Sequence, residues 1–401
     1  MDTTLTMKNE EKMQAVEIRS VWYPRAGSEV HPRDVEKIRA QQGSRVWMQP
    51  TAALIRTKRP ELRDTEVLIR VRACGLCGSD VSMAAQDHDG YARYPFMMRS
   101  PIIPGHEFAG EVVDMGSRAA EKRSWLKRGV PVTAQCVLNC GACDNCLNGE
   151  FDSCIAGEEL GFTRNGGMAE YCAVDARHVW SLLPLSDHYR TEDQLYLAGS
   201  LIEPMAGVFK GLNMVEWGHG DTLLIIGAGP IGLSALLVAQ ALGFGNILVA
   251  EVWRERRVKA NRLGASHSFC PLAHKLSDVV LELTGGRGAD VVFEASGYAE
   301  KNWDELNVLW RRQKADPRMV FFGQSKKELP FNPQLPIQRY AKFVGSHGHT
   351  KVWDSVIRMV GAGRINPLPM ITRTISLQEA PEWLKRLQTD KSECKVTITE
   401  F

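Results

Sequence analysis

The most distinctive hydrophobic pattern in the chain is an uncharged stretch from Thr222 to Ala250. Its length could cross a membrane, but the glycines at 227, 229, 232, 243 and 245 and Pro230 would break a single helix. We therefore interpret it as a buried strand, a helix and a second strand. Apolar runs at 290–294, 319–323 and 342–345 continue the alternation with helical patterns. This order predicts an α/β fold with a doubly wound parallel sheet.

The pattern on either side of this region is more mixed. Alternating polar and apolar residues predict strands at 66–73 and 108–113, and the end of the chain suggests helices at 352–363 and 378–389 before a strand at 395–399. Residues 1–60 are charged, with prolines at 24, 32, 50 and 60. We expect this first part to be extended and poor in strands.

Composition narrows the possible functions. The 401 residues are enough for two or three domains, and 49 basic against 47 acidic residues give a net charge of only +2. We therefore expect neither a nucleic-acid nor a membrane partner. The N-terminus has no apolar segment typical of a signal peptide, so ten cysteines favour metal binding or catalysis over disulfides. A cytoplasmic location is expected.

Four of the cysteines are closely spaced. Cys140, Cys143, Cys146 and Cys154 lie within 15 residues, in a segment with little helix or strand character. This spacing is typical of a lobe folded around one tetrahedral zinc ion. Because four thiolates leave no open coordination position, such a zinc would be structural. The alternative is a set of buried thiols or a redox pair.

Two short glycine-marked loops carry a second set of possible ligands. Cys77-Gly78-Ser79-Asp80 and Gly105-His106-Glu107 offer sulfur, nitrogen and oxygen, a mixture that suits zinc. The alternative is one buried cysteine and one core histidine that are unrelated. Glu203, in the apolar segment Leu201-Ile202-Glu203-Pro204, is a further candidate. From the residues alone, Glu203 is better explained as an acid in the first turn of a helix.

The glycine-rich turn predicts a dinucleotide site. Gly227, Gly229 and Gly232 follow an apolar strand and open a helix, which allows a tight turn and close approach of the backbone, with Pro230 and Ile231, to a pyrophosphate. Glu251 follows the second strand, 19 residues after the last glycine. A carboxylate there suits the ribose hydroxyls of NAD and would repel the 2′-phosphate of NADP.

Basic residues follow directly after this acid. Arg254, Arg256 and Arg257 are candidate phosphate ligands that weaken the preference for NAD, and we include Arg256 among the cofactor-binding residues.

The order of these motifs resembles the zinc-containing medium-chain alcohol and polyol dehydrogenases, from about residue 66 to the C-terminus. The resemblance implies a GroES-like catalytic domain of residues 1–204 and 350–401, with an inserted Rossmann domain of residues 205–349. It implies a catalytic zinc at Cys77, His106 and Glu203. Glu107 would enter or support its shell, and Asp80 would orient the histidine. It also implies NAD as cofactor, two zinc ions per chain and a homo-oligomer, a dimer or tetramer.

Within this family, the chain is most similar to inositol- and inosose-oxidising members. The segments 73–81, 345–349 and 385–392 and the long loop before His106 carry this likeness. The implied substrate is a cyclitol-like polyol, for which the loop 84–100 and His347–His349 would line a pocket. Acyclic polyols, sugars and amino alcohols remain alternatives. A non-catalytic NAD-binding protein is another, although every candidate metal ligand is present.

The proton pathway departs from the family pattern. Many relatives have a histidine five residues after the zinc cysteine, where this chain has Ser82. We expect Ser79 to pass the substrate proton outward, with water or His88 beyond it. The 60-residue N-terminal stretch also exceeds the usual family length.

Overall fold

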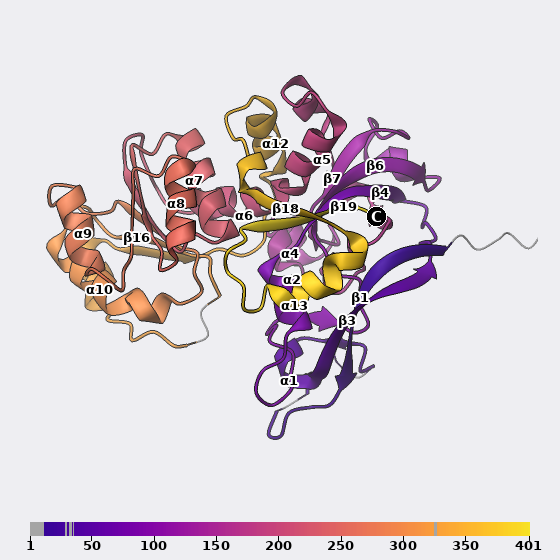
Figure 1. Cartoon of the computed structure of the whole chain (residues 1–401), viewed down its shortest axis with the longest axis horizontal. Helices are drawn as coiled ribbons and strands as arrows, with labels where there is room; N and C mark the ends of the chain where they lie inside the picture. The colour runs from indigo at the N-terminus through magenta and orange to yellow at the C-terminus, as the bar shows by residue number, and fades with distance from the viewer. Residues whose placement is uncertain (1–11, 29, 32–33, 35, 325–326) are drawn as a thin grey trace, which may run out of the picture.

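The structure is a computed structural model that describes residues 12–28, 30–31, 34, 36–324 and 327–401. Two lobes lie side by side along the longest axis (Figure 1). One lobe, drawn in pink to orange, contains helices α7 (Pro230–Leu242) and α10 (Ala299–Arg312). The other combines the indigo to magenta N-terminal half with the yellow C-terminal part. The N-terminal half of the chain therefore begins one lobe, the middle part builds the orange lobe, and the C-terminal part returns to the lobe of the N-terminal half.

A six-stranded parallel sheet forms the centre of the orange lobe, in the order β14-β13-β12-β15-β16-β17. Along β12 (Thr222–Ile226), Leu223 and Ile225 pack in one core with α7, whereas Leu224 and Ile226 pack in another with α10. Helices therefore cover both faces, which confirms the predicted doubly wound sheet. The other elements are β13 (Asn246–Ala250), α8 (Arg254–Arg262), β14 (His267–Phe269), α9 (Leu276–Leu283), β15 (Val291–Glu294), β16 (Arg318–Phe321), α11 (Gln334–Arg339) and β17 (Lys342–Gly345).

The other lobe is built on a mostly antiparallel sheet in the order β11-β7-β6-β4-β19-β18, with β10 also paired to β4. Strand β19 (Lys395–Glu400), at the end of the chain, lies beside β4 (Glu66–Gly75), with Ile398 opposite Cys74. Residues from both ends of the chain thus share one sheet and one core, which is the arrangement of the expected split GroES-like domain. The other elements are α2 (Gly78–Ala84), β6 (Glu107–Met115), β7 (Pro131–Ala134), β10 (Tyr171–Asp175), β11 (Val179–Ser181), α5 (Glu192–Ser200), α12 (Trp353–Gly361), β18 (Ile371–Ser376) and α13 (Ala380–Arg386).

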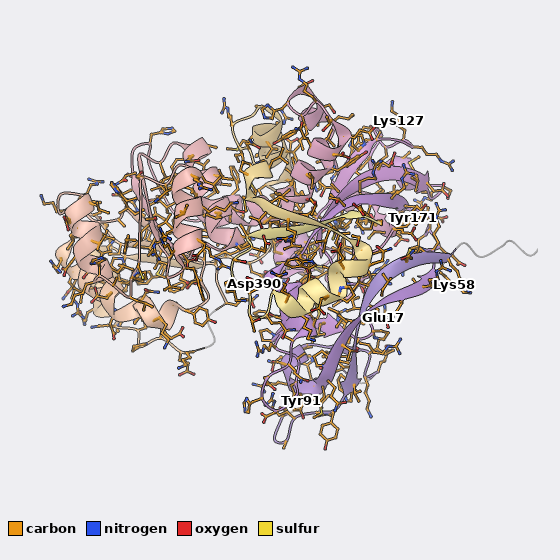
Figure 2. The ribbon with its side chains drawn as sticks, in the orientation of Figure 1. Glu17, Lys58, Tyr91, Lys127, Tyr171 and Asp390 are labelled. Atoms are coloured by element: carbon orange, nitrogen blue, oxygen red, sulfur yellow. The ribbon has the colours of Figure 1, made fainter. Side chains whose placement is uncertain are left out.

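The N-terminal part contains two long strands, so the expectation of a strand-poor segment was wrong. Strands β1 (Lys12–Trp22) and β3 (Trp47–Lys58) pair antiparallel along almost their whole length. Glu17 and Lys58 mark this ribbon, and Tyr91 lies near the tip of the lobe (Figure 2). Pro50 lies where the register shifts between Arg19 and Val21, a position at which the missing N–H interrupts the ladder least.

This N-terminal part supports one wall of the functional site. Trp47 is 2% exposed, and its indole N–H donates to the carbonyl of Met98 at 3.2 Å. It belongs to the same buried cluster as Tyr94 and Phe162, whose rings stack 5.1 Å apart. Both rings reappear below as walls of a cavity.

Helix α6 (Ile202–Leu212) connects the two lobes. A boundary between residues 204 and 205 would fall inside its first turn, so the domain limits given above stay predictions. In the described residues, no helix has the length and apolar character needed to cross a membrane.

Candidate active site

Cys77 and His106 lie on two loops that one buried carboxylate connects. Cys77 caps the N-terminus of α2, and its backbone N–H donates to Asp80 Oδ2 at 2.8 Å. Asp80 Oδ1 accepts from the backbone N–H of Gly105 at 3.2 Å and lies 3.7 Å from His106 Nδ1. Candidate ligand atoms of Cys77, His106 and Glu107 all lie within 4.8 Å of one another. The two loops therefore bring three of the four expected ligands together.

Glu107 is held from its other side by a lysine. The ammonium of Lys395 pairs with the Glu107 carboxylate and donates to the carbonyl of Leu76 at 3.2 Å. Lys395 is 0% exposed. Burial lowers the pKa of Lys395, but the adjacent Glu107 carboxylate more than offsets this and keeps it above the usual value. Because removing one member of a buried pair leaves an uncompensated charge, Lys395 fixes the position of the Glu107 carboxylate.

Glu203 lies in the first turn of α6 but is not part of the Cys77 group. Its Oε1 lies 3.0 Å from His349 Nε2, and Trp353 Nε1 donates to His349 Nδ1 at 3.0 Å. Since Nδ1 accepts, the neutral imidazole carries its proton on Nε2 and donates it to Glu203. Burial raises the pKa of Glu203, but the His349 hydrogen bond and the electrostatic effects of His349, His106 and Lys395 together outweigh it, so the pKa is lowered. With Cys136, these two residues form a second group of possible ligand atoms within 4.8 Å of one another.

Both groups line one cavity of about 390 Å³ between the lobes. His347 and His349 line it as predicted, whereas Tyr94 is the only residue of the 84–100 loop among its lining residues. The buried hydroxyl of Ser79 also lines it and has no hydrogen-bond partner among the described residues. The Rossmann side contributes Ile231, Ala295, Ser296, Gly297, Tyr298, Phe322, Gly323 and Gln324. The cavity therefore joins the metal-ligand candidates to the expected cofactor side.

Two residues considered for proton transfer are placed differently. The hydroxyl of Ser82 lines the cavity but donates to the carbonyl of Gly78 at 2.9 Å. The side chain of His88 is 86% exposed, lies 3.3 Å from Asp89, and is not among the residues that line the cavity. The structure thus gives no contact that would connect His88 to Ser79.

The four cysteines of the segment 140–154 converge, as predicted from their spacing. Their sulfur atoms lie within 4.8 Å of one another, with Cys140 to Cys146 at 4.0 Å and Cys143 to Cys154 at 3.8 Å. A tetrahedron with metal–sulfur bonds of about 2.3 Å has edges of about 3.8 Å. Backbone N–H groups, first that of Cys146, lower the pKa of Cys143 to about 6. The thiols therefore fit a zinc ion, and no disulfide joins the cysteines.

The four-cysteine segment 140–154 contacts the cavity through Asp152. One carboxylate oxygen of Asp152 accepts from Lys210 Nζ at 2.7 Å and from Thr350 Oγ1 at 2.6 Å, and the other accepts from the backbone N–H of His349 at 3.1 Å. Lys210 also donates to the carbonyl of His347 at 2.7 Å. Asp152 and Lys210 together therefore hold the segment that carries both cavity histidines.

The glycine turn has the geometry expected of a dinucleotide site. Gly227 has φ +92, and a Cβ on Gly232 would lie 1.8 Å from the carbonyl oxygen of Gly227. Gly229 caps α7 and Pro230 is its first residue. The free N–H groups at this end of α7 could therefore face a pyrophosphate, and the pyrophosphate site stays a prediction.

Glu251 and Arg256 flank this turn. Glu251 is 5% exposed and accepts from the backbone N–H groups of Ala228 at 2.7 Å and Trp253 at 2.8 Å. Arg256 donates to the carbonyl of Lys391 at 3.0 Å, and a Cβ on Gly229 would lie 3.8 Å from its guanidinium. The acid is thus fixed at the end of β13 and the arginine lies beside the helix N-terminus.

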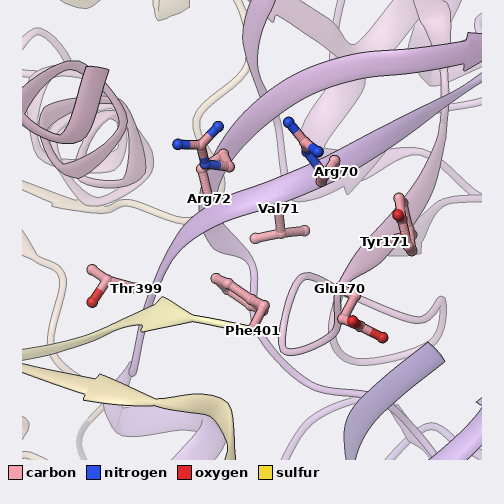
Figure 3. A pocket seen from close by; sticks show the side chains of 7 residues that line it. All are labelled: Arg70, Val71, Arg72, Glu170, Tyr171, Thr399 and Phe401. Carbon is pink, nitrogen blue, oxygen red and sulfur yellow. The ribbon is translucent and has the colours of Figure 1, made fainter. Parts of the chain in front are cut away.

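A second hollow of about 380 Å³ lies away from this site, on the outer sheet (Figure 3). Arg70, Arg72, Tyr171 and Phe401 line it. Both arginines are already bonded to the Glu111 carboxylate, Arg70 Nε at 2.9 Å and Arg72 at 3.2 Å. Arg72 also lies 3.6 Å from Glu192, so the described residues supply one acid for each of the two guanidinium groups and do not favour an anion site here.

Comparison with known proteins identifies the class. Residues 63–184 match the alcohol dehydrogenase GroES-like domain, and residues 230–362 match the zinc-binding dehydrogenase domain. The chain is 36% identical over 394 residues to scyllo-inosose 3-dehydrogenase of Thermotoga maritima, covering 96% of this chain and 99% of that protein. It is 30% identical to D-arabitol-phosphate dehydrogenase of Enterococcus avium, covering 84% and 91%.

Solved structures agree with this. A Thermotoga maritima protein described as an alcohol dehydrogenase superposes with a TM-score of 0.93 at 35% identity, covering 97% of this chain and 100% of that one. More distant structures of the same fold hold NADP or NADH. The chain therefore belongs to the zinc-binding medium-chain dehydrogenase family. It is an NAD(P)-dependent oxidoreductase of the alcohol and polyol dehydrogenase type.

Several residues of the site could not be recognised in the sequence. Lys395 begins an ordinary alternating strand, and its burial depends on β19 lying beside β4. Glu159 and Cys136 lie in short segments without a motif, and they reach the cavity because the strands β8 (Val137–Leu138) and β9 (Glu158–Glu159) pair. His349 is the exception, because the sequence predicts that His347–His349 line the pocket.

Proposed function

We propose that this enzyme oxidises a secondary hydroxyl of a cyclitol-like polyol, an inositol, inosose or aminocyclitol, with NAD as hydride acceptor. The main support is the cavity between the lobes, whose walls carry hydroxyl, imidazole and carboxylate groups beside the candidate metal ligands. The similarity to scyllo-inosose 3-dehydrogenase over nearly the whole chain supports a ring substrate. Relatives that include sorbitol and L-threonine 3-dehydrogenases make an acyclic polyol, sugar or amino alcohol the second candidate.

The proposed ligands of a catalytic zinc are Cys77, His106 and either Glu107 or Glu203. The proposed ligands of a structural zinc are Cys140, Cys143, Cys146 and Cys154, which gives two zinc ions per chain. A bound catalytic zinc polarises a substrate hydroxyl and lowers its pKa, while the nicotinamide supplies the hydride acceptor.

Side chains of the protein would transfer the proton of the substrate hydroxyl. Ser79 Oγ, which is buried in the cavity and has no hydrogen-bond partner among the described residues, would accept the hydrogen bond of the reacting hydroxyl and relay its proton outward, with the ribose of a bound cofactor and water beyond it. Ser82 does not replace the family histidine in this role, because its hydroxyl is bonded to Gly78 and cannot hold a proton at working pH. Lys395 and His349 hold the carboxylates of Glu107 and Glu203 in place.

NAD is the proposed cofactor in preference to NADP. The fixed carboxylate of Glu251 lies at the end of β13, where it would accept hydrogen bonds from ribose hydroxyls and repel a 2′-phosphate. Gly227, Gly229, Pro230, Ile231 and Gly232 would surround the pyrophosphate, with Arg256 beside them.

A homo-oligomer, a dimer or tetramer, is the proposed assembly. Strand β17 is at the edge of the parallel sheet, and Phe331, Ile337 and Tyr340 beside it are 54%, 68% and 79% exposed. An open edge strand flanked by exposed apolar side chains favours pairing with another subunit.

The substrate proposal is tested by a screen for NADH formation with ring polyols, acyclic polyols, amino alcohols and simple alcohols. Ring polyols should exceed ethanol and benzyl alcohol by roughly a thousandfold or more in kcat/KM, because a site with buried polar groups rejects analogues that leave them unpaired. A preference for simple alcohols would refute the polyol proposal, and a preference for sorbitol or threonine would support the second candidate.

The two zinc sites are tested by metal analysis and two matched cysteine variants. Cys77→Ser should fold with one zinc per chain and no activity, whereas Cys143→Ser should lose folding stability, because binding of a structural zinc is coupled to folding. One zinc or none in the fully active unmodified enzyme would refute the proposal.

A further inference from the structure

The charges in the cavity are unevenly matched. Three carboxylates line it, those of Glu107, Glu159 and Glu203. Glu107 pairs with Lys395, and Glu203 pairs with His349. For Glu159, by contrast, the described part of the chain provides no hydrogen-bond or ion-pair partner for the carboxylate. A half-buried carboxylate without a partner is costly unless a ligand completes its hydrogen bonds.

The backbone at Glu159 is firmly held. Its carbonyl accepts from the N–H groups of Thr163 at 2.9 Å and Arg164 at 3.0 Å, and its own N–H donates to Thr163 Oγ1 at 2.8 Å. Successive side chains of a strand point to opposite sides, so Glu158 turns outward to Arg164, 3.6 Å away, while Glu159 turns into the cavity. The orientation of Glu159 is therefore a property of the fold.

No cation is placed to receive an anionic substrate. Among the described residues that line the cavity there is neither a lysine nor an arginine. The groups whose electrostatic interaction favours ionised Glu159 are the imidazoles of His347, His106 and His349 and, outside the cavity, Arg39, which donates to the carbonyl of Gly157 at 3.2 Å. Burial raises the pKa of Glu159, and these groups oppose the rise. A phosphate or carboxylate on the substrate would thus meet acids without a compensating lysine or arginine.

We propose that Glu159 determines substrate specificity, accepting hydrogen bonds from hydroxyl or ammonium groups on the part of the polyol remote from the reacting carbon. The site then selects uncharged and amine-bearing polyols and rejects phosphorylated ones. This inference rests on the proposed polyol dehydrogenase function and assigns a part of the substrate that the candidate metal ligands and Ser79 do not contact.

The choice between neutral and phosphorylated substrates is a real one in this family. One relative is a D-arabitol-phosphate dehydrogenase, whose name indicates a phosphorylated substrate. Glu159, together with the lack of lysines and arginines among the described residues that line the cavity, favours the neutral side of that division for this chain. Because a carboxylate attracts an ammonium and repels a phosphate, replacing its charge should change the two preferences in opposite directions.

The test compares Glu159→Gln with Glu158→Gln, the adjacent residue on the same strand that points away from the cavity. The probes are myo-inositol, an amino-deoxy-inositol and myo-inositol 1-phosphate, assayed for kcat/KM at about pH 8, where an ordinary glutamate is ionised. Glu159→Gln should lower the ratio of amine to neutral substrate roughly tenfold and raise the ratio of phosphate to neutral substrate roughly tenfold. Glu158→Gln should leave both ratios within about twofold.

Two further measurements separate charge from shape and from folding. Glu159→Asp keeps the charge but shortens the side chain, so it should retain the rejection of phosphate with a higher KM for myo-inositol. Calorimetric binding of the amino-deoxy-inositol should weaken in Glu159→Gln by the same factor as kcat/KM, with an unchanged melting temperature.

The outcomes distinguish this inference from the function on which it rests. Unchanged ratios in Glu159→Gln, or equal use of myo-inositol and its phosphate by the unmodified enzyme, would overturn the role of Glu159 while leaving a polyol dehydrogenase intact. Failure to oxidise any polyol would instead refute the proposed function itself.

Discussion

Asp152 connects the four-cysteine segment 140–154 to the segment that carries the cavity histidines. Replacing Asp152 should weaken the contact between these two segments. Its side chain is 12% exposed and accepts from the Lys210 ammonium, the Thr350 hydroxyl and backbone N–H groups of His349 and Thr350. Gly348 adjoins it so closely that a Cβ there would lie 2.1 Å from Asp152 Oδ1, and its φ is +71. The segment is therefore shaped around this one carboxylate.

The size of the effect follows from these contacts. Asp152→Asn keeps an oxygen for the backbone N–H groups but turns an amide NH₂ towards Lys210, which retains only the carbonyl of His347. The variant loses one charged hydrogen bond and leaves the Lys210 ammonium without its counter-charge. Together these changes should lower the free energy of unfolding by about 2–4 kcal/mol. Combined with Lys210→Met, the total should fall short of the sum by about 1–3 kcal/mol, because both changes remove the same bond.

Urea unfolding monitored by tryptophan fluorescence measures the stability, and steady-state kinetics measures the consequence for the site. Asp152→Asn should raise KM for the best ring polyol roughly tenfold, because His347 and His349 lose their support. It should not change the measured zinc content, proposed above to be two ions per chain, since no thiol is changed. The matched control is Glu150→Gln, an exposed acid of the same lobe. If Asp152→Asn unfolded at the same urea concentration as Glu150→Gln, the proposed connection would be wrong.

Two further predictions concern the cofactor and pH. Glu251→Ser should weaken NAD binding and narrow the kcat/KM gap to NADP, whereas equal use of both cofactors by the unmodified enzyme would show that the arginines at 254–257 dominate. Desolvation lowers the pKa of buried His178 from 6.5 to about 4. Between these two pH values only the unfolded state takes up a proton. The free energy of unfolding is therefore unaffected by His178 above pH 6.5 and falls by about 3 kcal/mol as the pH drops to about 4. His178→Gln should remove this part of the pH dependence of unfolding.

The parts of the fold that the sequence predicted best are those with local signals. The strand, glycine turn and helix from Thr222 to Leu242 follow from uncharged residues and three glycines, because each step depends only on its immediate neighbours. The N-terminal strands were missed for the opposite reason. Their prolines and charges are typical of irregular structure, and only the pairing of β1 with β3 shows that Pro50 lies at a register shift.

The candidate site divides in the same way. Cys77, His106 and the four-cysteine lobe carry motifs and could be recognised, whereas Lys395 reaches Glu107 only because the last strand pairs with β4. The expected role of Glu203 beside Cys77 came from resemblance. Its observed partner, His349, is 146 positions later in the chain, a pairing that no spacing rule could predict.

The pattern of satisfied and unsatisfied groups indicates where ligands act. Glu107 has Lys395, Glu203 has His349 and Asp152 has Lys210, so each of these carboxylates has a partner within the chain. Among the described residues that line the cavity, Ser79 Oγ and the Glu159 carboxylate lack a hydrogen-bond partner, and so does His106 Nδ1, whose ring belongs to the candidate metal ligands. A fold that satisfies its other buried charges leaves the first two for the substrate, Ser79 at the reacting hydroxyl and Glu159 at the remote part of the polyol. Catalysis and specificity would then depend on different elements of the same lobe, Ser79 in α2 and Glu159 in β9, so a change in β9 can alter the substrate without altering the chemistry.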